Sequence, residues 1–198
     1  MGVISLMSCS GAPGVTTVSL ATTAALTATS APEPVMIEVA ASGGVVASQY
    51  DLPSEPGLTS LAIALGAEPP DILEHAQELP GGVPVVVAPA SNSKIVKLVE
   101  ARAEPLAQYL ADAAATSVVD CGRISSASPL KPILKVSALV GLVIRPSREN
   151  FQLAATTLAE LDETMGRPAP VGWVIVGSCP WSHDEIIERY GLPVLSAI

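Results

Sequence analysis

The chain has 198 residues, enough for one domain with a sizeable core, and 49% of them are hydrophobic while only 15% are charged. This composition excludes a disordered chain, and no uninterrupted apolar stretch has membrane-spanning length. The net charge of −9 is unevenly distributed, because residues 1–93 contain eight acidic residues and no Lys or Arg. Such a chain is a poor candidate for binding nucleic acid or an anionic membrane, since both need clustered cations.

Seven short runs rich in Val and Ile predict the strands of a sheet. They are apolar at successive positions, which is typical of strands buried on both faces in a parallel sheet covered by helices. In chain order, the predicted strands span residues 3–8, 34–39, 83–88, 116–120, 139–144, 172–176 and 193–196.

Helical patterns fill most of the gaps between these runs. The predicted helices span residues 14–28, 58–65 and 92–113, a segment from Ser147 to Met165, and a last segment opened by a capping box of Ser182 and Glu185. Pro105 is expected to kink or divide the third of them. The pattern predicts one α/β domain, residues 1–198. It has three layers (α/β/α), with a mostly parallel, twisted sheet of about seven strands and helices on both faces.

Cysteine and histidine usage indicates a reducing environment and no metal centre. The three cysteines are odd in number and far apart, which argues against a disulfide framework or a zinc ribbon. Neither His75 nor His183 has a second residue at metal-ligand spacing. The first ten residues lack the basic region of a secretory signal, so we expect a cytoplasmic protein.

A loop with the sequence S-C-S-G-A-P-G-V-T-T, residues 8–17, joins the first predicted strand to the first predicted helix. In a phosphate-binding P-loop, backbone N–H groups surround the phosphates, a lysine reaches the outer phosphates, and a Ser or Thr hydroxyl binds Mg²⁺. The last glycine of that motif is present as Gly14, but a valine follows it where the lysine belongs. The same residues also fit a tight turn whose threonines only cap the helix. The predicted nucleotide-binding residues are Gly11, Ala12, Pro13, Gly14, Val15, Thr16 and Thr17.

Two carboxylates lie at the ends of predicted strands. Asp120 ends the strand 116–120, and Glu38 lies near the end of the strand 34–39. Ligands of α/β proteins bind outside the carboxyl ends of parallel strands, so both residues are candidate catalytic groups. The alternative is that each is a cap or a loop acid.

Taken in order, these segments resemble the MinD/ParA family of deviant Walker P-loop ATPases. Aligned on the threonine pair, the family's loop, roughly K-G-G-V-G-K-T-T, matches residues 10–17. Residues 34–44 resemble the family's second strand and switch segment, and residues 117–122 resemble its Walker B strand. The likeness extends over nearly the whole chain. It is nearest to an acidic, alanine-rich, degenerate branch, similar to the TadZ and CpaE localisation factors of pilus systems.

The resemblance implies ATP and Mg²⁺ as cofactors, with Thr16 and Asp120 as the magnesium ligands. It also implies a homodimer that forms face to face over the loops and buries Ser10, Gly11 and Pro13 against the partner. Membrane-attached members carry a C-terminal amphipathic helix. This chain ends directly after its last predicted strand, so we expect no membrane anchor in it.

Four positions depart from the family pattern. Ser10 stands for the signature lysine that reaches the partner's nucleotide, and Val15 stands for the catalytic lysine. Glu38 and Ala40 stand for the two aspartates of the switch segment. A lysine at the transferred phosphate supplies positive charge where negative charge accumulates, and its loss commonly lowers the rate by orders of magnitude.

A substitute cation has to come from outside residues 1–93, or from a partner. Arg123, three residues after Asp120, is the best placed, ahead of Arg145 and Arg148. Its alternative interpretation is a solvent-facing loop residue.

Three functions fit these observations. The first is a pseudo-ATPase that acts as a positioning or scaffold module, through stable dimerisation and binding to a protein of a positioning or secretion system, with ATP binding weak or lost. The second is an active ATPase that dimerises with ATP and uses Arg123 or a partner's arginine. The third is a metabolite-transforming member of the same fold superclass, which the missing lysine disfavours. Direct binding to nucleic acid is not expected for any of them.

Overall fold

The computed structural model describes residues 2–11, 13–29, 32–66, 68–165 and 170–198. Within these residues, eight strands form one sheet in the order β3-β4-β2-β5-β1-β6-β7-β8. They are β1 (Val3–Ser8), β2 (Val35–Glu38), β3 (Gln77–Leu79), β4 (Val83–Val86), β5 (Ser117–Arg123), β6 (Ser137–Ile144), β7 (Val171–Ile175) and β8 (Val194–Ala197). All seven predicted strands are present, and each pairs in parallel with its neighbours among them.

The prediction of about seven strands is one too low, because β3 pairs antiparallel with β4 at the edge of the sheet. β3 has three residues, of which only Leu79 is apolar and buried, so it makes no apolar run. The turn that joins the two strands contains Gly81 and Gly82, both with positive φ. This glycine pair is the hairpin signal that the apolar pattern could not supply.

Every predicted helix is present, although the shortest helical elements were not predicted. The helical elements are α1 (Val15–Thr27), α2 (Val46–Gln49), α3 (Leu58–Ala64), the 3₁₀ helix η1 (Ile72–His75), α4 (Asn92–Asp112), α5 (Lys131–Val136), α6 (Arg148–Met165) and α7 (His183–Tyr190). α4 continues through Pro105 without division, and the buried Ala103 and Leu106 hold the helix on either side of it. The capping box of Ser182 and Glu185 is confirmed at the start of α7.

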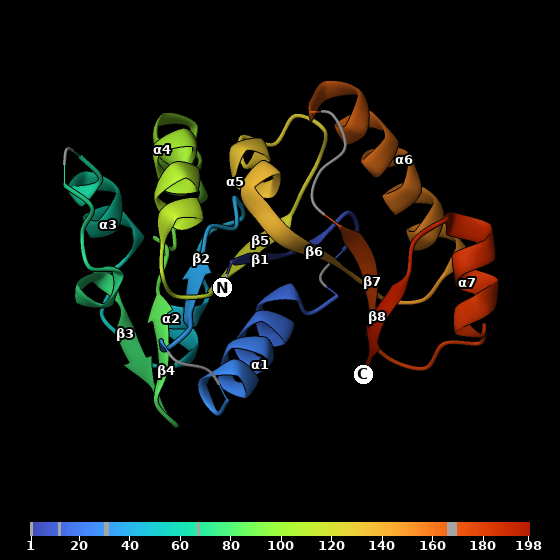
Figure 1. Cartoon of the computed structure of the whole chain (residues 1–198), viewed down its shortest axis with the longest axis horizontal. Helices are drawn as coiled ribbons and strands as arrows, with labels where there is room; N and C mark the ends of the chain where they lie inside the picture. The colour runs from blue at the N-terminus through green and yellow to red at the C-terminus, as the bar shows by residue number, and fades with distance from the viewer. Residues whose placement is uncertain (1, 12, 30–31, 67, 166–169) are drawn as a thin grey trace.

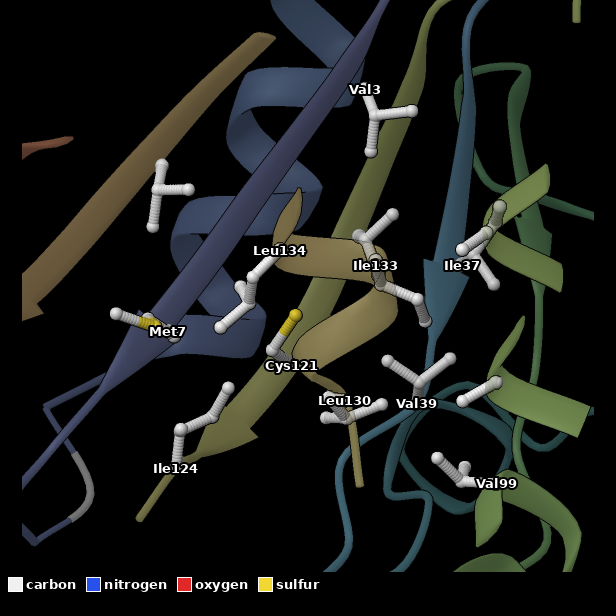
Figure 2. Close-up of a cluster of buried hydrophobic side chains, with 14 of the residues drawn as sticks. Val3, Met7, Ile37, Val39, Val99, Cys121, Ile124, Leu130, Ile133 and Leu134 are labelled. Carbon is white, nitrogen blue, oxygen red and sulfur yellow. The ribbon is translucent and has the colours of Figure 1, made fainter. Parts of the chain in front are cut away.

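Helices cover both faces of the sheet, which confirms the three-layer prediction. α1 and α2 lie on one face, and α3, α4, α5 and α6 lie on the other (Figure 1). The larger core lies on the second face, where Ile133 and Leu134 of α5 point toward β1 and β5 beside Cys121 (Figure 2). In the described part of the chain, no helix has the length and apolar character needed to cross a bilayer.

Candidate functional site

The loop after β1 leads directly into the N-terminus of α1. Gly14 is the N-cap residue and has a left-handed conformation, φ 100° and ψ 33°, which a residue with a side chain rarely adopts. No side chain caps this helix, and its first turn contains no acid. The first backbone N–H groups of α1 therefore point toward the loop without an intrahelical acceptor, an arrangement that favours an anion.

The predicted nucleotide-binding residues of the loop differ in exposure. Gly11 is exposed and has a φ of 50°, whereas Pro13 is buried and has no N–H group to offer. Thr17 is exposed and Thr16 is half-buried. Ala12 lies outside the described residues.

Thr16 and Asp120 lie in direct contact, although 104 residues separate them in the sequence. The Thr16 hydroxyl donates to Oδ2 of Asp120 at 2.6 Å, and the Gly122 N–H donates to Oδ1 at 2.9 Å. Asp120 is fully buried on β5, and its side chain lies on the face of the sheet that α1 covers. Burial raises the pKa of its carboxyl group, while the two hydrogen bonds oppose that rise.

Glu38 is the neighbour of Asp120 across the β2–β5 register, and it holds a loop in place. Its Oε1 accepts from the N–H groups of Val45 and Val46 at 2.7 and 3.2 Å, and its Oε2 accepts from the Ala88 N–H at 3.0 Å. Burial raises the pKa of its carboxyl group, the three N–H donors oppose the rise, and the charge of Asp120 adds to it. The carboxylate thus ties the segment after β2 to the end of β4.

Gly44 allows this arrangement because there is no room for a side chain. A Cβ atom at this position would lie 2.2 Å from the Ala88 carbonyl oxygen and 2.7 Å from Oε2 of Glu38. The glycine pair at residues 43–44 is the sequence signal for this close approach. All the hydrogen bonds of Glu38 come from backbone N–H groups, so the sequence contains no side-chain pattern that predicts them.

Val15 occupies the position of the expected lysine and packs into the core. Its side chain is only 6% exposed and belongs to an apolar cluster between α1 and the sheet. The cluster consists of Leu6, Val15, Val18, Val118, Val143 and Val174. This side chain contributes packing on the α1 face and no charge to the loop.

Arg123 lies at the end of β5, opposite Ser8 in the β1–β5 register and exposed to solvent. Burial raises the pKa of the nearby Cys9 thiol to about 11, and a hydrogen bond with Thr157 and the positive charge of Arg123 oppose that rise. Cys9 is thus a buried, protonated thiol, as expected for a small core residue. Of the arginines proposed as cation substitutes, Arg123 is placed next to the loop in this way.

The Thr16 and Asp120 pair suits a magnesium ion by its chemistry. A hydroxyl and a carboxylate are hard oxygen donors, and Mg²⁺ is held in proteins by one or two such groups together with phosphate oxygens and water. No cluster of three or more His, Cys, Asp or Glu residues that could hold a metal ion by itself occurs among the residues that the structure describes. The donor set therefore fits a metal that arrives with a phosphate ligand.

Replacing Asp120 with asparagine is expected to raise the unfolding temperature at neutral pH. Because the folded chain raises the pKa of Asp120, it binds more protons than the unfolded chain between the two pKa values, and stability falls as pH rises through that interval. Asparagine does not titrate, can still accept from the Gly122 N–H, and can donate to Thr16. Unfolding of both proteins over a pH series tests this, and the variant's advantage should disappear below the ordinary aspartate pKa of 3.8. A variant less stable than the wild type at neutral pH would contradict the expectation.

No family model matches this chain, and the search of curated proteins found no match. Solved structures with the same architecture are numerous. A ParA family ATPase from Chlorobium tepidum TLS superposes with a TM-score of 0.82 at 19% identity, covering 100% of this chain and 83% of that one. The cell division ATPase MinD from Pyrococcus furiosus gives a TM-score of 0.75 at 15% identity, with coverage of 100% and 83%.

A cobyrinic acid a,c-diamide synthase from Mycobacterium smegmatis, solved with a bound ATP analogue and magnesium, is also similar. It gives a TM-score of 0.71 at 15% identity, with coverage of 98% of this chain and 82% of that one. At these identities the likeness establishes the fold alone. The chain has a MinD/ParA-like P-loop NTPase fold, as the sequence resemblance predicted.

Proposed function

We propose that this chain is a MinD/ParA-like positioning or scaffold module that acts through dimerisation and partner binding, with ATP binding weak or lost. The observation that carries the proposal is the burial of Val15 in the apolar cluster of α1, at the position where the fold's ATPases hold a lysine. Residues 1–93 contain no Lys or Arg that could take over its role. Without that cation, charge developing on a transferred phosphate has no fixed positive partner within this half of the chain.

Under this proposal, the loop and α1 still bind phosphate and magnesium, but weakly. Thr16 and Asp120 would hold the ion, whose contribution when bound is to neutralise phosphate charge. The unpaired N–H groups at the start of α1 would face the phosphate. Pro13 removes one loop donor, and the acidic first half of the chain opposes a triphosphate. Together, these features favour weak binding of ATP without efficient hydrolysis.

The proposed dimer forms over the loop and needs no nucleotide. Gly11 is exposed and Ser10 is half-buried, so these two residues offer surface for the contact, whereas Pro13 is already buried within the single chain. A loop without charged side chains suits a permanent contact better than a phosphate cradle. The partner chain would be a second copy, and the bound protein would belong to a positioning or secretion system.

Titration with a fluorescent ATP analogue and Mg²⁺ tests the proposal directly. We expect a dissociation constant on the order of 1 mM or weaker for the wild type, together with sedimentation as a dimer without nucleotide. Thr16→Val removes the hydroxyl that donates to Asp120, and Thr17→Val is the matched control on the exposed neighbour. Neither variant should change the oligomeric state. A monomer with and without ATP, or hydrolysis at rates typical of intact ATPases, would overturn the proposal.

An ATP-dependent switch is the second candidate, and the position of Arg123 favours it. Arg123 stands opposite Ser8, the first residue of the loop, in the β1–β5 register, so this alternative assigns the role of the lysine to Arg123. Under this alternative, ATP binds tightly, the dimer forms only with ATP, and both Thr16→Val and Arg123→Ala abolish it. Arg189→Ala, which removes an exposed arginine of α7, is the control for the loss of one positive charge. Unchanged dimerisation in Arg123→Ala would rule out this alternative for the chain's own arginine.

A further inference from the structure

A groove of about 930 Å³ lies at the end of the sheet opposite the loop and Asp120. The segment around η1 forms one wall, and the C-terminal half of α4 forms the other. The short segments that precede β2 and β5 close its base. Its surface is mainly apolar, with Leu65, Ile72, Leu73 and Tyr109 among the lining residues. The volume lies in the range of protein ligand sites, which are usually apolar with few polar groups.

The groove has few hydrogen-bond donors to offer. Four of its lining residues are prolines, which have no N–H group: Pro32, Pro69, Pro70 and Pro105. The Tyr109 hydroxyl already donates to the Pro70 carbonyl oxygen at 2.8 Å. Gln108 donates to Asp112 at 3.0 Å. Apart from Arg102 and the second N–H of Gln108, the lining side chains offer mainly acceptors, so the groove suits a ligand that brings its own donors.

The rim of the groove is negatively charged. Three carboxylates, Glu33, Asp71 and Asp112, lie among the described lining residues, and Arg102 is the one cation there. All four side chains are exposed. Burial and, to a smaller extent, the negative charge of Asp71 raise the pKa of Tyr109, which lies on the apolar wall. Acceptors and negative charge around an apolar floor are complementary to a cation attached to apolar groups.

We propose that this groove binds a short segment of a partner protein in which Lys or Arg side chains flank apolar ones. The apolar side chains would enter between η1 and α4, and the cations would meet the three rim carboxylates. The groove lies away from the nucleotide loop, so this proposal stands whether or not the chain binds ATP. The proposed dimer contact over Ser10 and Gly11 leaves this end of the sheet accessible.

The test selects binders from a random peptide library on the wild-type chain. Two triple variants with equal net charge then measure what the selected peptides recognise. The rim variant carries Glu33→Gln, Asp71→Asn and Asp112→Asn. The control variant carries Glu160→Gln, Asp162→Asn and Glu163→Gln, all on the exposed side of α6. Asp71 caps η1 by accepting from the Leu73 N–H. Asparagine at position 71 can still accept this hydrogen bond, so the fold is preserved.

A second pair of variants tests the apolar floor. Leu73→Ala shortens a lining side chain that is 45% exposed, and Ile63→Ala shortens one on α3 that is 75% exposed and outside the groove. Circular dichroism and thermal unfolding of each variant check that the fold is retained. Any loss of binding can then be assigned to the groove.

Selected peptides should combine Lys or Arg with large apolar residues, and their affinity should weaken as salt is added. We expect a loss of about tenfold in the rim variant and in Leu73→Ala, against less than about twofold in the two controls. Failure to enrich peptides, enrichment of acidic ones, or equal loss in the rim and α6 variants would overturn the proposal. Self-association that Leu73→Ala abolishes would also overturn it, because the occupant would then be a second copy.

Discussion

Replacing Val15 with lysine is expected to tighten binding of Mg-ATP about 10- to 100-fold. A charge-assisted hydrogen bond to phosphate contributes about 1.5–3 kcal/mol, and the fold provides the helix N-terminus and the Thr16–Asp120 pair beside it. The same change removes an apolar side chain from the α1 cluster, so the free energy of unfolding should fall by about 1–2 kcal/mol. Titration with the fluorescent analogue and urea unfolding measure the two effects.

Val15→Met is the control for this experiment, because it lengthens the side chain without adding charge. It should leave nucleotide affinity unchanged, while the longer side chain in the apolar cluster should lower the free energy of unfolding by about 1–3 kcal/mol. If the lysine variant is folded and binds no better than the methionine variant, then the missing cation does not limit binding. The proposed function would lose its main support in that case, since another feature of the loop would be responsible.

Replacing Glu38 with glutamine is expected to lower the free energy of unfolding by about 2–3 kcal/mol. Three backbone N–H groups donate to its two oxygens, and an amide offers only one oxygen. In the variant, a buried N–H group, that of Ala88 or those of Val45 and Val46, faces an NH₂ group instead of an acceptor. Urea unfolding measures the loss, and Glu78→Gln on the exposed part of β3 should change stability by less than about 0.5 kcal/mol.

This result separates two roles for Glu38. The sequence analysis predicts that Glu38 is a catalytic carboxylate, and that role remains a prediction. If Glu38 acts mainly in catalysis, Glu38→Gln should unfold like the wild type and lose only activity. Asp120→Asn provides the contrast, because the neighbouring carboxylate accepts one hydroxyl and one N–H, and asparagine can satisfy both.

The sequence was sufficient for the seven strands that pair in parallel. Buried parallel strands are continuous runs of Val and Ile, so β1, β5 and β6 stand out in the sequence. The family resemblance implied that Thr16 and Asp120 share a magnesium site, and the two side chains lie in contact.

The rest of the site depends on contacts that leave no local signal. The burial of Val15 depends on side chains from four strands, and the hydrogen bonds of Glu38 come from backbone N–H groups. The groove beside Tyr109 is formed by segments about thirty residues apart, and two of its prolines, Pro69 and Pro70, are typical of a loop when taken from the sequence alone. Short elements such as β3 and α5 are fixed by their surroundings rather than by their own periodicity.

The hydrogen bonds from Val45 and Val46 to Glu38 limit how readily the segment after β2 can move. A segment that moves whenever a nucleotide is exchanged must break these bonds in each round and leave a buried carboxylate without donors. The free-energy cost of breaking these hydrogen bonds applies each time the segment moves. The segment is therefore poorly suited to rearranging at every nucleotide exchange.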